Sequence, residues 1–302
     1  MIELWIPVTL AAALFQTWRT ALQQKLRGLL SVNAAGFVRY VYAIPTGTAM
    51  LLLYTLISGH ALPVLNASFL TYCTVGGLGQ IFGTSLLIMA FGHRNFAVGT
   101  AYAKTEAVQG AILAWIILGE ALAPLAWLGI AIGVVGVLVL SLAGRGIKRA
   151  DLLAATFQPA ALCGLGAGLC FAFTTVLIKQ ANFALGGADL IHQALFTLVV
   201  TNILQTLMQG SWLALREPEQ LQKSFTSWRS SAWVGTLSAC GSACWFTAFA
   251  MAPVALVRAI GQVEMVFTFA FSRFYLKERI NRADVIGLLL VVGGVVIILI
   301  GR

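Results

Sequence analysis

The sequence predicts an all-α membrane protein of ten transmembrane helices, arranged as two inverted five-helix repeats. Three observations predict this fold class. The composition is apolar, ten apolar stretches are each long enough to cross a bilayer, and glutamates recur at the same place in the two halves. The first excludes a soluble protein, the second sets the number of spans, and the third divides them into halves.

Composition alone places the chain in a lipid bilayer. Of its 302 residues, 60% are hydrophobic and only 10% are charged, and the mean hydropathy is +0.91. Soluble domains carry about 25% charged residues. A cytosolic enzyme, a nucleic-acid-binding module and a disordered tail are therefore excluded, although a net charge of +9 would suggest nucleic acid in a soluble protein.

Cysteines and the chain start add two expectations. The five cysteines lie in apolar stretches without a CxxC pair, so we expect buried thiols rather than a disulfide framework or a metal site. The start Met-Ile-Glu-Leu-Trp lacks a basic region before its apolar residues, so a cleaved signal peptide is not expected.

Ten stretches reach the ~20 residues that a helix needs to cross the hydrocarbon core. They lie near 4–24, 36–58, 69–91, 95–118, 124–143, 159–181, 187–209, 229–251, 254–275 and 284–301. The remaining residues suffice for loops only. The longest loops, 144–158 and 210–228, mix charged with apolar residues, as interfacial segments do.

Two glutamates in register indicate an internal repeat. A shift of 158 residues places Glu106 on Glu264, although the chain holds only ten acidic residues. The same shift aligns Glu120 with Glu278, Gly77 with Gly235, Gly83 with Gly241, Phe91 with Phe249, Gly129 with Gly287 and Gly136 with Gly294. We expect one five-helix repeat over 1–146 and a second over 147–302. Because each has an odd number of spans, the two face opposite sides of the membrane, a plan common among secondary transporters.

The basic residues predict the orientation. Most of them lie in every second connection, beginning with the one between the first and second spans, and the opposite side has little beyond Lys179 and Arg302. The positive-inside rule then makes the basic connections cytoplasmic and leaves both termini outside.

Short motifs close the fourth and ninth spans. Leu-Gly-Glu at 118–120 and Leu-Lys-Glu at 276–278 are each followed by a glycine-bearing apolar span. They are preceded by Thr-Glu-Ala-Val at 105–108 and Val-Glu-Met-Val at 263–266, and Arg39 lies early in the second span. This pattern resembles EamA-type transporters of the drug/metabolite transporter superfamily.

The resemblance covers essentially the whole chain, with departures in its motifs. The family's prolines are replaced by Ala107 and Met265, and its second Gly-Glu is Lys277-Glu278. The resemblance implies a multi-pass protein of the bacterial inner membrane that transports metabolites, with export as the commoner direction. It also implies cytoplasmic termini, which is the opposite of the orientation that the basic residues predict.

Glu106 and Glu264 fall at the centres of the fourth and ninth spans. A carboxylate at the bilayer centre costs about a few kcal/mol, so it faces a partner or a wet cavity. Either these carboxylates carry a proton or bind a cationic group of the substrate, or they form ion pairs that lock the halves together. Candidate partners are Lys104, Arg258 and Arg19.

Helical spacing adds polar groups to a predicted substrate and proton pathway. Tyr102, Glu106 and Gln109 fall at i, i+4 and i+7, which gives one polar face. Lys104 lies about 160° around the helix from Glu106 and need not share a surface with it. Arg258 either lines the pathway or extends its charge to the membrane surface.

Arg19, Gln80, Trp18 and Trp245 complete the predicted pathway. Arg19 belongs to a polar stripe on the first span, Gln80 lies among four glycines, and Trp245 shares a helix face with two serines. An aromatic-walled cavity with a few ionisable groups suits a small zwitterion or organic ion. The alternative for each aromatic side chain is a position facing lipid.

These features favour a secondary active transporter over an enzyme, working by alternating access around a midplane site. The intramembrane cations outnumber the two central acids, which favours a substrate with a carboxylate, such as an amino acid, exchanged for protons. The expected partners are thus a small molecule, protons and the bilayer, with no nucleic acid. Because the sequence has no phosphate loop or nucleophile motif, we expect no cofactor, no catalytic residue and no bound metal.

Several alternatives stay open. The acids and arginines would also suit a membrane-embedded lipid-handling protein or enzyme, whereas a channel is disfavoured because no filter motif is present. His60, His93 and His192 have no second ligand at metal spacing. Gly129 and Gly133 form a GxxxG pair that suits packing within a monomer or in a homodimer.

Overall fold

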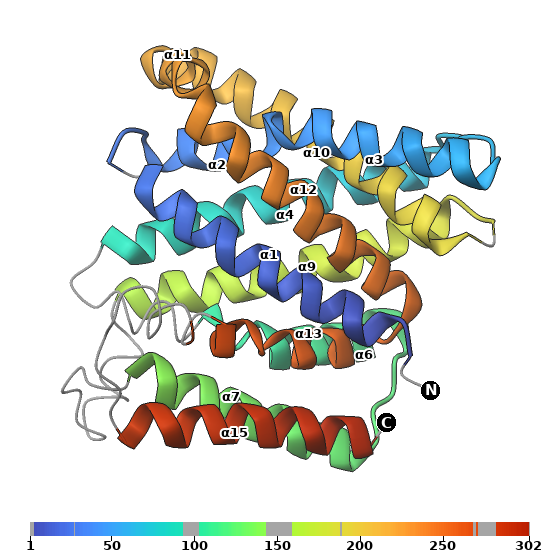
Figure 1. Ribbon diagram of the computed structural model, residues 1–302, viewed down its shortest axis with the longest axis vertical. Coiled ribbons are helices and arrows are strands. Elements are labelled where there is room, and N and C mark those ends of the chain that lie inside the picture. Colours follow the sequence, from blue (N-terminus) through green and yellow to red (C-terminus); the bar gives the residue numbers. More distant parts are fainter. Residues whose placement is uncertain are drawn as a thin grey trace. The chain divides into compact units, whose positions relative to one another are not determined.

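The structure is a computed structural model that describes residues 3–26, 28–92, 103–142, 159–187, 189–267, 270 and 282–301. Within these residues every regular element is a helix (Figure 1), which confirms the all-α prediction. The helices are α1 (Trp5–Leu26), α2 (Val32–Val41), α3 (Ala43–Ser58), α4 (Ala67–Gly92), α6 (Glu106–Leu118), α7 (Pro124–Leu142), α9 (Pro159–Ala184), α10 (Leu190–Arg216), α11 (Pro218–Thr226), α12 (Trp228–Met251), α13 (Val254–Gly261) and α15 (Arg282–Ile300).

Five helical stretches of the described chain are long and apolar enough to cross a membrane. They are Val32–Ser58, Ala67–Ala90, Ala161–Ala184, Leu190–Arg216 and Trp228–Met251. Shorter apolar helices cover Glu106–Leu118, Pro124–Val139 and Val285–Ile300. All eight overlap stretches that the sequence predicts as spans.

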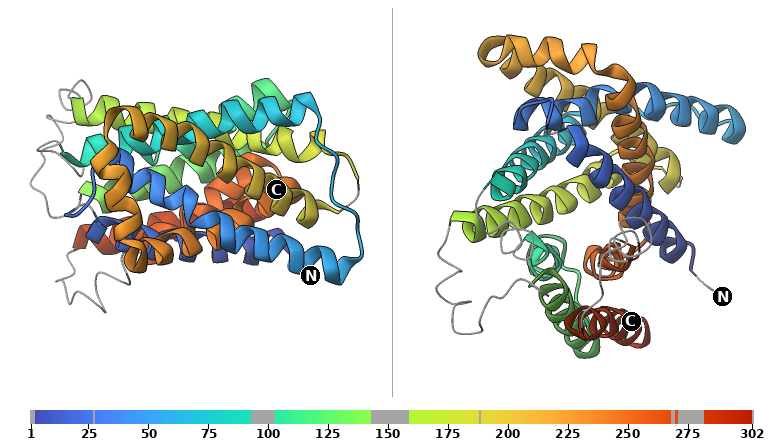
Figure 2. Two further views of the ribbon diagram at one scale, coloured as in Figure 1. Left: turned by 90° about the horizontal axis from the view of Figure 1, so that it is seen from above. Right: turned by 60° about the vertical axis from the view of Figure 1, so that its left-hand side comes forward.

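The chain divides into two compact units, and each draws helices from both halves of the sequence. Unit 1 comprises Met1–Ile81 and Leu177–Ala252, and unit 2 comprises Phe82–Val176 and Pro253–Arg302. In unit 1, α1 lies along α12, and α10 packs against α2, α3 and α12. In unit 2, α7 and α15 lie side by side (Figures 1 and 2), and α13 packs against α6.

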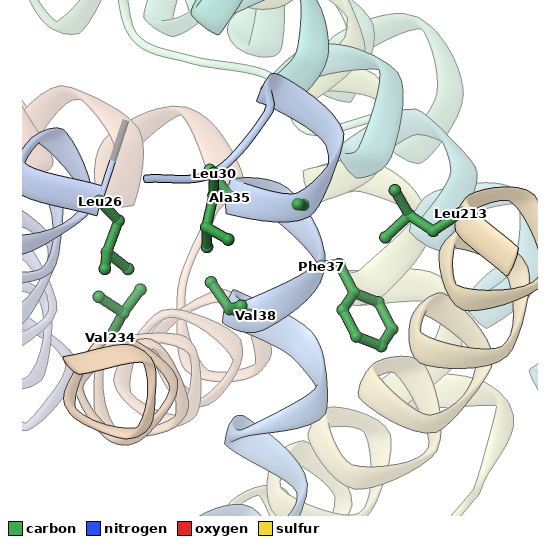
Figure 3. Packing of buried hydrophobic residues seen from close by; sticks show 8 residues of the cluster. Leu26, Leu30, Ala35, Phe37, Val38, Leu213 and Val234 are labelled. Carbon is green, nitrogen blue, oxygen red and sulfur yellow. The ribbon is translucent and has the colours of Figure 1, made fainter. Parts of the chain in front are cut away.

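An apolar cluster at the start of α2 fixes part of unit 1. Ser31 caps α2, because its hydroxyl oxygen accepts the backbone N–H of Ala34 at 3.2 Å. Behind this cap, Phe37 and neighbouring side chains of α2 pack against Leu213 of α10 and Val234 of α12 (Figure 3). Leu213 is fully buried there.

This packing explains one difference from the sequence prediction. The connection expected at 210–228 is helical for most of its length, since α10 continues to Arg216 and α11 follows. Residues 210–216 mix polar with apolar side chains, so hydropathy alone ends the span early. Burial of Leu213 against α2 stabilises the extra turns of helix.

Glycines hold α7 and α15 in backbone contact within unit 2. A Cβ atom placed on Gly136 would lie 2.6 Å from the backbone nitrogen of Val291, and one on Gly294 would lie 2.7 Å from the carbonyl oxygen of Gly129. A Cβ on Gly129 would in turn lie 2.8 Å from the carbonyl oxygen of Gly294. The predicted Gly129–Gly133 pair thus packs within the chain.

Helix bounds recur at the spacing found in the sequence. Adding 158 to the bounds of Val32–Ser58 gives those of Leu190–Arg216, and adding it to Pro124–Leu142 gives Arg282–Ile300. The contact between α7 and α15 follows the same spacing. Gly129 of α7 contacts Gly294 of α15, and Gly294 lies 158 residues after Gly136 of α7.

Candidate functional site

The fourth and ninth predicted spans are both interrupted next to their central glutamates. Residues 104–105 form a turn, after which α6 begins at Glu106. In the ninth span α13 ends at Gly261, residues 262–263 form a turn, and helix resumes at Glu264. Each glutamate is therefore the first helical residue after a break.

The two breaks share one backbone hydrogen-bond pattern. In each, a single carbonyl oxygen accepts the N–H groups of the residues three and four positions further on. The acceptor is Thr105 in the first break, at 3.0 and 3.1 Å, and Val263 in the second, at 2.8 and 3.1 Å. Such shared acceptors mark a short 3₁₀ turn at a helix terminus. Thr105 and Val263 are again 158 residues apart.

Two ion pairs join the segments on either side of these breaks. Arg258 of α13 donates from Nη1 to Oε1 of Glu106 at 3.1 Å. Lys104 donates from Nζ to Oε2 of Glu264 at 2.9 Å. The four side chains are 12–20% exposed. We call them the crossed ion pairs, because each carboxylate is paired with a cation from the other half of the sequence.

Arg258 is also held from α9. Its Nε donates to the hydroxyl oxygen of Thr175 at 3.1 Å, and Nη2 donates to the same atom. Breaking a buried ion pair by removing one partner costs about 3–5 kcal/mol, because the other charge loses its compensation. A guanidinium fixed from two sides holds the carboxylate of Glu106 in one orientation.

Two amide side chains accompany the breaks, and one is half-buried and the other buried. Gln109 donates from Nε2 to the hydroxyl of Thr105 at 3.0 Å, while its Oε1 has no hydrogen-bond partner among the described residues. Gln262 lies in the second break and is 6% exposed, and neither polar atom of its side chain has a partner in the described part of the chain. Gln262 was not predicted as a site residue, although a shift of 158 aligns it with Lys104. Tyr102 lies outside the described residues.

Other predicted pathway residues lie in unit 1. Trp245 is buried, donates from Nε1 to Oε1 of Gln16 at 3.0 Å, and stacks on Phe249 with ring centroids 5.6 Å apart. Gln80 accepts from Nε2 of Gln205 at 2.7 Å. These contacts give each side chain a fixed orientation.

Trp18 and Arg19 lie on α1, also in unit 1. Trp18 is 52% exposed and Arg19 is half-buried. Unit 2 thus brings together Lys104, Glu106, Gln109, Arg258 and Glu264, and unit 1 holds the other described pathway residues.

Two buried cations of unit 1 were not predicted as site residues. Arg39 is 7% exposed and donates from Nε to the hydroxyl oxygen of Ser238 at 3.1 Å. Lys179 is 6% exposed and donates to the carbonyl oxygen of Ala252 at 2.8 Å. Lys179 is one of the few basic residues on the side opposite the basic connections, and it lies inside α9. In the sequence, Lys179 is recognisable as a charged residue near the end of a long apolar stretch.

Glu120 serves a structural role. Its Oε2 accepts the backbone N–H of Val254, the first residue of α13, at 2.8 Å. This is the helix-end hydrogen bonding that a glutamate at a span end would be expected to make. It satisfies one of the N–H groups that a helix N-terminus leaves open. The equivalent residue Glu278 lies outside the described residues.

Removing this carboxylate is expected to destabilise α13. Glu120→Ala should cost about 1 kcal/mol, as for other lost N-terminal caps, and lower the midpoint of thermal unfolding by about 2 °C. Glu120→Gln keeps an acceptor oxygen and should lose less. Tryptophan fluorescence during heating in detergent measures both. Equal losses in the two variants would show that the hydrogen bond is not the cause.

The long apolar helices are those of a multi-pass membrane protein. Paired charges lie between some of the helices. The model of the EamA-like transporter family matches residues 158–300. This match confirms, over residues 158–300, the resemblance to EamA-type transporters of the drug/metabolite transporter superfamily that the sequence motifs indicate. The EamA-like family is one of membrane transporters.

Twenty-nine chains of solved structures match this chain. One of them, described as "Crystal structure of protein", has a TM-score of 0.75 at 16% sequence identity, over 100% of this chain and 98% of its own. At this identity the similarity shows the fold alone. No curated protein matches the sequence.

Proposed function

We propose that the chain is a secondary active transporter that exports a small amino-acid-like metabolite in exchange for protons. Ten spans in two inverted repeats, 1–146 and 147–302, would provide alternating access in the inner membrane. The helix bounds that recur 158 residues apart support this architecture. So does the shared carbonyl acceptor that each interrupted span repeats at the same position.

The crossed ion pairs carry the proposal. Each pair sets a carboxylate against a cation, and an amino acid brings one group of each sign. The substrate carboxylate would bind Arg258 or Lys104, and its ammonium group would bind Glu106 or Glu264. A ligand that replaces both partners of a pair leaves no buried charge uncompensated.

Competition for the same carboxylate provides the coupling. A glutamate that has taken up a proton no longer attracts the substrate ammonium group, so proton and substrate occupy it alternately. Binding of a proton on one side of the membrane and of substrate on the other then gives exchange. A proton gradient directed inward drives the substrate outward.

Transport in proteoliposomes tests this proposal. With an imposed pH gradient and a panel of amino acids and organic ions, a carboxylate-bearing substrate is expected to move against its gradient. At least one of Glu106→Gln and Glu264→Gln should lose this coupling while still folding and reconstituting. Glu219→Gln, at an exposed position of α11, is the matched control and should transport as the wild type does.

Two outcomes would contradict it. If nothing in the panel moves, the substrate class is wrong. If substrate moves and both glutamine variants stay coupled to the gradient, the glutamates are structural and do not carry the proton.

A further inference from the structure

Both ends of α10 are held to the α2–α3 segment by a carboxylate, within unit 1. At the first end, Asp189 caps α10 and is bonded by side chains on and after α3. At the other end, Glu217 follows α10 and is bonded by side chains at the start of α2. We call these contacts the Asp189 latch and the Glu217 latch.

The Asp189 latch contains a histidine. Nδ1 of His60 lies 3.0 Å from Oδ2 of Asp189, and the hydroxyl of Tyr54 donates to both carboxylate oxygens, at 3.0 and 3.2 Å. Asp189 also accepts the backbone N–H groups of Ile191 and His192, at 3.1 and 3.0 Å. The side chain of His60 is 57% exposed, so aqueous protons reach it.

The Glu217 latch contains neutral partners. Nδ2 of Asn33 donates to Oε1 of Glu217 at 3.0 Å, and the hydroxyl of Ser31 donates to Oε2. The backbone N–H of Ser31 donates to the side chain of Gln220 at 2.9 Å. Hydroxyl and amide groups do not change their charge between about pH 5 and pH 8.

The two latches occupy equivalent positions with the chemistry exchanged. A shift of 158 places Ser31 on Asp189, and both residues cap the following helix with a side-chain oxygen. It also places Gly59, the neighbour of His60, on Glu217. In the Asp189 latch the carboxylate therefore belongs to the cap of α10, whereas in the Glu217 latch it belongs to the residue after α10.

We propose that His60 and Asp189 form a pH-sensitive latch, closed when His60 is protonated and loosened when it is neutral, whereas the Glu217 latch stays closed over the same range. A protonated imidazole is a charged donor, and a hydrogen bond between two charged groups is about twice as strong as a neutral one. Histidine is the side chain that changes charge near neutrality. The proposal rests on contacts within unit 1 and holds whether or not the chain transports amino acids.

Close to His60, the carboxylate and imidazole groups of the described residues are those of the latch itself, His60 and Asp189, and of one neighbour, His192. Burial alone would raise the pKa of Asp189, but the N–H of His192, the hydroxyl of Tyr54 and the imidazole of His60 together lower it. The carboxylate of Asp189 is therefore ionised at pH values above about 4. His192 is buried with its ring centroid 6.2 Å from that of His60, and its Nε2 lies 3.0 Å from the hydroxyl of Thr55.

α10 and the helices packed near α3 and α10 carry other charged residues, away from the Asp189 latch. They are Arg39 on α2, Glu219 and Lys223 on α11, Arg229 on α12, Lys179 on α9 and Arg216 on α10 itself. Arg216 ends α10, about 40 Å from Asp189 at 1.5 Å per residue. In the orientation that the basic residues predict, the Asp189 latch faces away from the cytoplasm and so would respond to external pH.

Hydrogen exchange of the full chain in lipid nanodiscs tests the latch without any transport assay. After correction for intrinsic rates, the last turn of α3 and the first turn of α10 should exchange about fivefold more slowly at about pH 5.5 than at about pH 8. The first turn of α2 and the last turn of α10, beside the Glu217 latch, should show no such difference.

Two variants decide the outcome. His60→Gln should remove the pH difference, and Asp189→Asn should remove it while keeping a side-chain acceptor at the helix cap. The proposal is overturned if the wild type shows equal protection at both pH values. It is also overturned if either variant keeps the full difference, since the sensor would then lie elsewhere, with His192 as the remaining titratable neighbour.

Discussion

Arg258→Met is expected to lower the midpoint of thermal unfolding by about 6–10 °C. It leaves the carboxylate of Glu106, which is 16% exposed, without its cation, and an uncompensated buried charge costs about 3–5 kcal/mol. Adding Glu106→Gln to the same chain should restore most of the loss, because no charge then remains to be compensated.

Unfolding in one detergent, followed by tryptophan fluorescence, compares the four proteins of this double-mutant cycle. Arg229→Met is the matched control, since Arg229 is exposed at the start of α12 and its loss should change stability by only about 0.5 kcal/mol. If the double variant is as unstable as Arg258→Met, the pair is not energetically coupled and the guanidinium stabilises the chain through Thr175 instead.

Gly294→Val is expected to give the second large loss of stability. Its Cβ would meet the carbonyl oxygen of Gly129 and the nitrogen of Gly133, both at 2.7 Å. Neither is the end of a flexible side chain, so α7 and α15 would have to separate. Overpacking costs about 1–3 kcal/mol where side chains can adjust, and contact with backbone should cost more.

The neighbouring glycine offers a sharp control. A Cβ on Gly293 meets nothing within 4 Å, so Gly293→Ala should be neutral or stabilise the helix by up to about 1 kcal/mol. Expression yield and unfolding midpoint should separate the two positions. Equal behaviour of Gly293→Ala and Gly294→Ala would contradict the backbone contact between α7 and α15.

Most helix positions could be predicted from the sequence, because a bilayer demands long apolar stretches. The span expected at 124–143 is α7, Pro124–Leu142, and the span expected at 229–251 is α12, Trp228–Met251. The breaks at 104–105 and 262–263 could not be predicted this way. Hydropathy continues through them, and the turns depend on contacts made by residues far apart in the chain.

The candidate site could be predicted as a set of residues but not as a set of partners. Glu106, Lys104 and Arg258 stand out as charges within apolar stretches. That Lys104 pairs with Glu264 depends on how two distant segments pack. Gln262 was not predicted as a site residue, because its burial in the second break depends on the same packing.

The carbonyl oxygens of Thr105 and Val263 each already hold both a three-residue and a four-residue partner. One carbonyl therefore satisfies two amides at each break, which matters at membrane depth because no water can replace a missing acceptor there. The chain can thus leave regular helix beside each glutamate without exposing these peptide groups to lipid.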